Sequence, residues 1–162
     1  YKDIIKKLKD KKPNIKFSSD FIIGYPGETE DDFNNTLSLM KELKFINSYS
    51  FIYSPRPGTP ASDLNQINKD VAKQRLAIFQ KTADEIKNNY RNKIVNTEVE
   101  VLFENKLKKQ NKYFGRDEYS NSVIVDSLEN LTGKSLKVII DNFNHNTLFG
   151  KININNKKNV AA

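Results

Sequence analysis

The residues best suited to chemistry gather in two loops in the first half of the chain. One stretch, Asp20-Phe-Ile-Ile-Gly-Tyr-Pro-Gly-Glu-Thr29, reads as a strand that ends in a tight glycine turn. Gly24 lets the backbone approach a ligand closely, and the Pro26-Gly27 turn presents amide N–H groups. Glu28 follows at the rim, where it is placed to bind an ammonium group or ribose hydroxyls. These types and spacings predict a ligand-binding loop; a capped helix without a ligand is the competing interpretation.

A purely structural role accounts for Asp20 and Arg56 less well than for the other candidates. A carboxylate within a central strand is costly unless it is paired or faces a wet site. Arg56 stands between Pro55 and Pro57, which limit the region its guanidinium can reach, and it is suited to bind a carboxylate or phosphate bidentately. The alternative is that both are structural ion-pair partners, of each other or of other groups.

A second group of candidates lies around Gly115-Arg116 in the last third of the chain. Unpaired RNA bases stack on aromatic rings while basic side chains follow the phosphates. Asp117 and Glu118 weaken the positive field, and His145, between two asparagines, is interpreted as a turn residue. The predicted RNA-binding side chains of this group are Lys108, Lys109, Lys112 and Arg116.

Composition bounds the classes of partner and cofactor. The 162 residues carry a net charge of +7, which suits a nucleic-acid partner, although a genome rich in A·T base pairs also yields many lysines and asparagines. Cysteine is absent, which excludes disulfides and iron–sulfur ligation within this chain. Neither a membrane span nor a signal peptide is visible, so we expect a cytoplasmic location.

The first half predicts a strand–helix–strand unit that positions the two loops. Thr29 is a good helix N-cap, and carboxylates fill the following turn. The flanking strands, near residues 15–24 and 48–53, should be parallel, each with one polar-leaning face. In an α/β barrel such faces would point into the lumen; an open sheet with one wetter face is the alternative. A long helix from Asn68 or Asp70 to about Arg91 should bury a narrow apolar stripe.

The pattern changes near residue 93. Several short alternating segments follow within about 60 residues, separated by glycines and polar turns, which predicts a small β-barrel. We therefore predict two domains, residues 1–92 and 93–154, with a polar tail at 155–162. The chain opens on Tyr1 in a lysine-rich helix, which indicates a piece of a longer protein.

The two loop motifs, together with Lys73-Gln-Arg-Leu76 and Gly115-Arg116, resemble the methylthiotransferases of the radical S-adenosylmethionine superfamily, in particular those acting on an N(6)-modified adenosine beside the tRNA anticodon. The resemblance implies that residues 1–92 are the last part of the family's TIM-like radical-SAM barrel and 93–154 a TRAM RNA-binding β-barrel. It implies S-adenosylmethionine contacts at Asp20, Gly24, Gly27, Glu28 and Arg56, with no catalytic or metal-ligating residue in this chain.

The same resemblance implies what lies outside this chain. Two four-iron four-sulfur clusters, their cysteine ligands, further amino-terminal domains and an electron donor would complete the enzyme, so the chain alone should be inactive. Relatives often carry a basic residue where this chain has Phe149 before Gly150, and Lys151 would take its place on the RNA. The alternatives are an enzyme acting on another tRNA adenosine or a ribosomal protein, or a non-catalytic RNA-binding module.

Overall fold

A computed structural model describes residues 1–108 and 111–153. The chain forms two compact units, Tyr1–Lys87 and Asn88 onward. Its elements, in order, are α1 (Lys2–Lys11), β1 (Ser18–Ile23), α2 (Glu30–Leu43), β2 (Asn47–Ile52), the short helix η1 (Pro60–Asp63), α3 (Lys69–Ile94), β3 (Glu98–Lys106), β4 (Lys112–Asp117), β5 (Ser122–Asp126), β6 (Ser135–Phe143) and β7 (Thr147–Ile152). The predicted tail lies outside the described residues.

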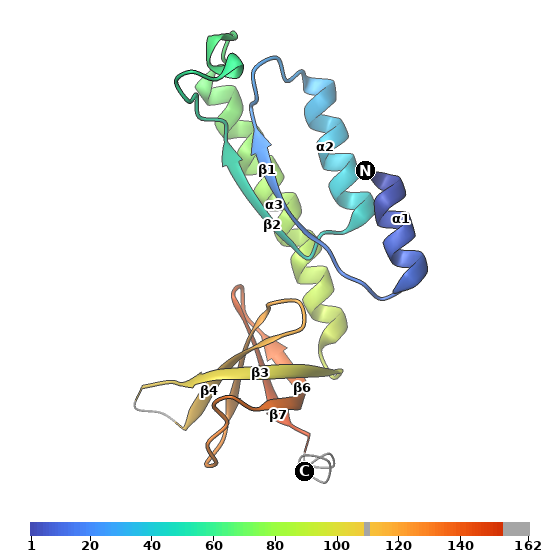
Figure 1. The fold of residues 1–162 in the computed structure, drawn as a ribbon, viewed down its shortest axis with the longest axis vertical. Coiled ribbons are helices and arrows are strands. Elements are labelled where there is room, and N and C mark those ends of the chain that lie inside the picture. The colour runs from blue at the N-terminus through green and yellow to red at the C-terminus, as the bar shows by residue number, and fades with distance from the viewer. Residues whose placement is uncertain (109–110, 154–162) are drawn as a thin grey trace. The chain divides into compact units, whose positions relative to one another are not determined.

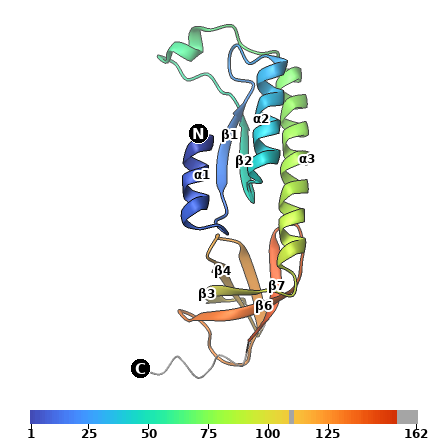
Figure 2. The ribbon, with the colours of Figure 1, turned by 90° about the vertical axis from the view of Figure 1, so that its right-hand side faces the viewer.

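The first unit is built around a parallel pair of strands, β1 and β2, as predicted. Helix α3 runs along the two strands in both ribbon views (Figures 1 and 2). The ring of Phe79 on α3 lies 4.8 Å from that of Phe21 on β1. The buried core of this unit comes from all three helices, from β1 and from the segment before β2, and comprises Ile5, Ile23, Phe33, Met40, Leu43, Phe45 and Phe79.

The cap of α2 is the one that the sequence predicts. The hydroxyl of Thr29 accepts a hydrogen bond from the N–H of Asp32, whose carboxylate accepts one from the N–H of Thr29. The Thr29 hydroxyl, followed by its N–H, holds the pKa of the Asp32 carboxyl below its ordinary value. This reciprocal pair fixes the end of the loop that begins at Gly24.

The polar-leaning faces predicted for β1 and β2 do not lie on the same side of the sheet. The register places Tyr49 opposite Asp20 and Phe51 opposite Ile22, so both aromatic residues lie on the exposed face with the aspartate. Ser48 and Ser50 lie on the other face, which the helices partly cover. The rings on that side already fill the space under α3, so small side chains from β2 suffice there. The polar residues of the two strands therefore do not share one face.

The second unit is a closed five-stranded barrel in the order β3–β4–β5–β7–β6, which confirms the predicted small β-barrel. All neighbours are antiparallel except β5 and β7, which pair in parallel. Its interior is filled by Val101, Phe103, Tyr113, Val123, Val125, Leu131, Val138, Ile140 and Leu148. The last turn of α3 belongs to this unit, because Ile94 packs against that interior and Arg91 Nη1 donates to the carbonyls of Asn144 and His145 at 2.6 and 2.5 Å.

Candidate functional site

The loop after β1 depends on two glycines with positive φ. Gly24 has φ +73°, and a Cβ at this position would lie 2.9 Å from the Cβ of Ala72 on α3. Gly27 has φ +85°, but a Cβ there would meet nothing within 4 Å. The first glycine thus lets the loop lie against α3, whereas the second leaves open space beside the turn.

The side chain of Glu28 holds this loop in place by hydrogen bonds. Its Oε2 accepts a hydrogen bond from the N–H of Gly24 at 3.2 Å, and its Oε1 accepts one from Arg75 Nη1 at 2.7 Å. Only 11% of the Glu28 side chain and 9% of the Arg75 side chain are exposed. The carboxylate of Glu28 therefore ties the glycine turn to α3.

Arg75 is a site residue to which sequence reasoning gave no role. Its Nη1 also donates to the carbonyl oxygen of Glu28, and its Nη2 donates to Glu30 at 3.0 Å. The guanidinium lies 5.6 Å from the ring centre of Phe33. Burial alone would lower the pKa of Arg75, but the hydrogen bonds and charges of Glu28 and Glu30 outweigh it and raise that pKa. The only indication of this role in the sequence was the position of Arg75 next to Leu76, on the buried side of the long helix.

Asp20 and Arg56 are both exposed and lie on different elements. Asp20 belongs to the open face of β1, beside Ile22, and Arg56 belongs to the loop after β2. Within the described ranges neither forms an ion pair, so the interpretation of the two as structural partners finds no support. Both charges are free to meet a ligand.

The two loops begin side by side, as expected for parallel strands that end at one edge. The N–H of Tyr53 donates to the carbonyl of Ile23 at 2.9 Å. The rings of Tyr25 and Tyr53 meet edge to face, with 5.2 Å between their centres. The glycine turn and the proline loop therefore start from one shared edge of the sheet.

The predicted RNA-binding residues spread over the outside of the barrel. Arg116 Nε donates to Glu104 Oε1 at 3.0 Å, and its guanidinium lies 5.4 Å from the ring centre of Phe114. Lys151 pairs with Asp141 at 3.0 Å. Lys108 is exposed and Lys112 half-buried, while Lys109 lies outside the described residues. All the described members are therefore at or near the surface.

Asp117, one of the two acidic residues expected to weaken the positive field, is turned inward. Its side chain is buried, and its Oδ1 accepts hydrogen bonds from the N–H groups of Tyr119 and Asn121 at 2.9 and 2.8 Å. Its Oδ2 accepts a third from Asn121 Nδ2. The carboxylate closes the turn between β4 and β5, and burial beside it raises the pKa of the Tyr90 phenol.

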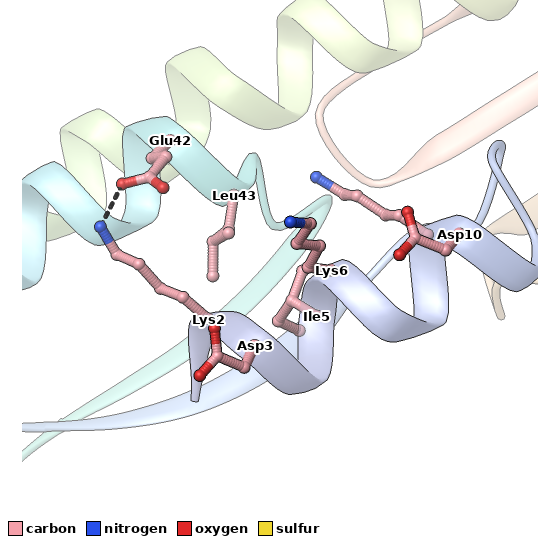
Figure 3. A pocket seen from close by; sticks show the side chains of 8 residues that line it. Lys2, Asp3, Ile5, Lys6, Asp10, Glu42 and Leu43 are labelled. Atoms are coloured by element: carbon pink, nitrogen blue, oxygen red, sulfur yellow. Dashed lines mark hydrogen bonds and ion pairs between the residues drawn. The ribbon is translucent and has the colours of Figure 1, made fainter.

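A hollow of about 420 Å³ lies between α1 and α2. Ile5 and Leu43 form its apolar lining, and Lys2 reaches across to Glu42 (Figure 3). Three lysines and three carboxylates surround it, so the rim has no excess charge. This hollow does not select an anion or a cation.

No helix in the described parts of the chain has the length and apolar character that crossing a membrane requires. Across residues 1–108 and 111–153, no three histidine, cysteine or acidic side chains gather in a way that would hold a metal ion.

Comparison with known proteins supplies the relatives. No family model matches the chain. It is 50% identical to the tRNA-2-methylthio-N(6)-dimethylallyladenosine synthase of Pelagibacter ubique, over 98% of this chain and 35% of that protein. The proteins of the same name from Ruthia magnifica and Yersinia pestis are each 42% identical, over 94% and 93% of this chain. The chain spans about a third of the length of these relatives.

Proposed function

The chain belongs to the radical S-adenosylmethionine methylthiotransferase family, and we propose that it is the carboxyl-terminal third of an enzyme that adds a methylthio group to position 2 of N(6)-dimethylallyladenosine beside the tRNA anticodon. The observation that carries the proposal is 50% identity over 98% of the chain. On this assignment the enzyme works where its tRNA is, in the cytoplasm.

The first unit supplies part of the S-adenosylmethionine site in this proposal. The open face of β1 and β2 presents Asp20 with three large apolar residues, Ile22, Tyr49 and Phe51, each 59–61% exposed. An exposed apolar patch of this kind marks a binding or assembly surface. The remaining strands of a radical-SAM barrel would cover it, so that Asp20 would line the lumen beside the cofactor.

The loops at the strand ends support the same assignment. The turn from Gly24 to Gly27 is open on the side of Gly27, and Arg56 has no acidic partner within the described residues. Glu28 would then act by holding the turn in place through Arg75, because its carboxylate is already engaged. A nucleoside with a charged amino-acid group would suit the carboxylate of Asp20 on the open face of β1 and the guanidinium of Arg56 in the loop after β2.

The clusters would be held elsewhere in the enzyme. When bound, they and S-adenosylmethionine supply the radical chemistry of methylthio transfer. This chain has no cysteine and hence no thiolate for either cluster. The amino-terminal domains and an electron donor are therefore necessary partners, and the chain alone is inactive.

The second unit is the proposed tRNA-binding TRAM domain. A small closed β-barrel with cationic side chains on its outside is suited to hold an RNA stem-loop. Lys108, Lys109, Lys112, Arg116 and Lys151 would contact the phosphates. An adenosine in another sequence context, or a ribosomal protein, would be the substrate if this barrel does not bind the anticodon stem-loop.

A chimaera and a binding assay test the two parts separately. In the chimaera, this chain replaces the matching third of the Pelagibacter ubique enzyme, and methylthiolation of tRNA is measured after reconstitution of the clusters. We expect activity, and its loss in Asp20→Asn or Arg56→Met with unchanged tRNA affinity. An active chimaera insensitive to both substitutions contradicts the assignment of these residues.

For the binding assay, the full chain is titrated with an anticodon stem-loop at increasing salt. We expect affinity to fall linearly on logarithmic axes, with a shallower slope for Arg116→Ala because one phosphate contact is lost. Absence of binding at low salt contradicts the RNA-binding role.

A further inference from the structure

The barrel contains an internal repeat that relates its two long hairpins. In β3–β4, Phe103 pairs with Gly115, a bulge follows, and Asn105 pairs with Phe114. In β6–β7, Ile140 pairs with Gly150, a bulge follows at the same place, and Asn142 pairs with Phe149. The matching segments read Val-Leu-Phe-Glu-Asn and Val-Ile-Ile-Asp-Asn on one strand, and Phe-Gly-Arg and Phe-Gly-Lys on the other.

The repeat extends to the close contacts of the two glycines. A Cβ on Gly115 would lie 2.5 Å from the carbonyl oxygen of Leu102 and 2.8 Å from Val101 Cγ1. A Cβ on Gly150 would approach the corresponding oxygen of Ile139 and Cγ1 of Val138 still more closely. Each glycine lets its strand coil tightly at the bulge, so the residues on either side of it point out of the barrel.

The outward residues that flank each glycine form the same group twice. In the first hairpin these are Phe114 and Arg116, and Arg116 pairs with Glu104. In the second they are Phe149 and Lys151, and Lys151 pairs with Asp141, which occupies the position equivalent to Glu104. Each hairpin thus presents one aromatic ring and one cation on its outer surface.

The two groups lie across a single strand from each other. Ile124 on β5 pairs with Phe114 on one side and with Phe149 on the other. Phe114, Ile124 and Phe149 are half-buried, yet none belongs to the interior core or packs against it. Neighbouring strands are about 4.8 Å apart, so the two rings belong to strands roughly 10 Å apart.

Charge alone gives this unit little affinity for RNA. Its described residues carry nine lysines and arginines against eight acidic residues, and Arg91 is buried against backbone carbonyls. Sequence-independent phosphate binding rises with the number of cations that neutralise phosphates. Stacking of bases on rings adds affinity that does not depend on net charge.

We propose that the twin hairpins form two equivalent nucleotide subsites for unpaired RNA. One base stacks at Phe114 and another at Phe149, while Arg116 and Lys151 contact the adjoining phosphates. The proposal rests on the proposed function in one respect, that the barrel binds RNA, and it goes further by stating that unpaired nucleotides rather than a duplex are recognised. It also assigns a role to Phe149, which is the equivalent of Phe114 in the second copy of the repeat.

The experiment uses the full chain and a stem-loop RNA with 2-aminopurine in the loop, whose fluorescence falls when the base stacks. The variants are Phe114→Leu, Phe149→Leu and both together, with Phe149→Tyr as a ring-preserving variant. Leu102→Ala is the matched control, since Leu102 also points out of the barrel and is 53% exposed. Thermal unfolding of each variant checks that the barrel remains folded.

We expect each Phe→Leu change to weaken binding by about 5-fold or more, because one stacked base contributes roughly 1–3 kcal/mol. The double variant should lose more than either single one, with the salt slope unchanged in all three. Tyrosine at 149 should keep both affinity and quenching, and a duplex of the stem alone should bind no more tightly to the native chain than to the double variant.

Two results would overturn the inference, and they differ from failure of the proposed function. If the native chain binds the stem-loop but the folded Phe→Leu variants bind equally well, RNA is held by charge alone. If the native chain prefers the duplex stem, the subsites do not take unpaired nucleotides. If it binds no RNA at any salt, the proposed RNA-binding role fails together with this inference.

Discussion

Removing the Arg75 guanidinium should cost the first unit far more stability than removing an exposed charge. In Arg75→Met the side chain keeps most of its volume beside Phe33, but Glu28 loses the donor at 2.7 Å. Its carboxylate, 11% exposed, would retain only the N–H of Gly24 at 3.2 Å. Breaking a buried pair by removing one partner costs about 3–5 kcal/mol. The ion pair with Glu30 adds little to this, because that carboxylate is 70% exposed.

Urea unfolding followed by the helical circular dichroism signal measures this cost, since the helices lie mainly in the first unit. Lys2→Met is the matched control, because the Lys2–Glu42 pair is more than half exposed and such pairs contribute about 0–1 kcal/mol. In the double variant Arg75→Met, Glu28→Gln the uncompensated charge is gone, so most of the lost stability should return. The reasoning is refuted if Arg75→Met costs no more than Lys2→Met, or if the double variant is less stable than the single one.

Three further outcomes follow from the loops and the barrel. Gly27→Ala should cost roughly 1–2 kcal/mol in urea unfolding because of its positive φ, and Gly24→Ala should cost more, since its Cβ would also collide with α3; equal costs would contradict the close approach. Gly115→Ala should lower the melting temperature of the barrel well below that of Gly133→Ala, whose Cβ meets open space although its φ is +80°; a smaller effect than Gly133→Ala would refute this. The pKa of Asp32 is lower in the folded chain than its ordinary value of 3.8, so the stability that its carboxylate contributes is present above that pH and lost as the pH falls through the folded pKa. Asp32→Asn should therefore reduce the fall in melting temperature over this acidic range. An unchanged fall would argue against the cap.

The sequence predicts the elements well because their signals are local. The cap at Thr29 is confirmed by the structure. The predicted stripe of α3 has Ala72 and Phe79 buried and its other members half-buried, and the helix continues to Ile94. Alternation also predicts the strands of the barrel, and their closure follows from the lack of any other cover for so many short strands.

The misjudged features depend on pairings between distant segments. The faces of β2 follow from its register with β1, which strand alternation alone does not define. The role of Arg75 depends on Glu28, 47 residues away, and the inward turn of Asp117 depends on Asn121. The repeated hairpins were visible as two Phe-Gly-cation segments, but their equivalence becomes plain only when the bulges and partners are aligned.

The attachment of Arg91 to the turn between β6 and β7 bears on how such a barrel passes from one protein to another. A barrel excised at residue 93 would leave the carbonyls of Asn144 and His145 without their donor and would also lose Tyr90, which lies beside the turn between β4 and β5. The smallest piece that recombination can move intact therefore begins inside α3, near Asn88. A gene fusion that joins this barrel to a new partner would therefore carry the last stretch of α3 with it, and the barrel would bring a helical segment to the junction.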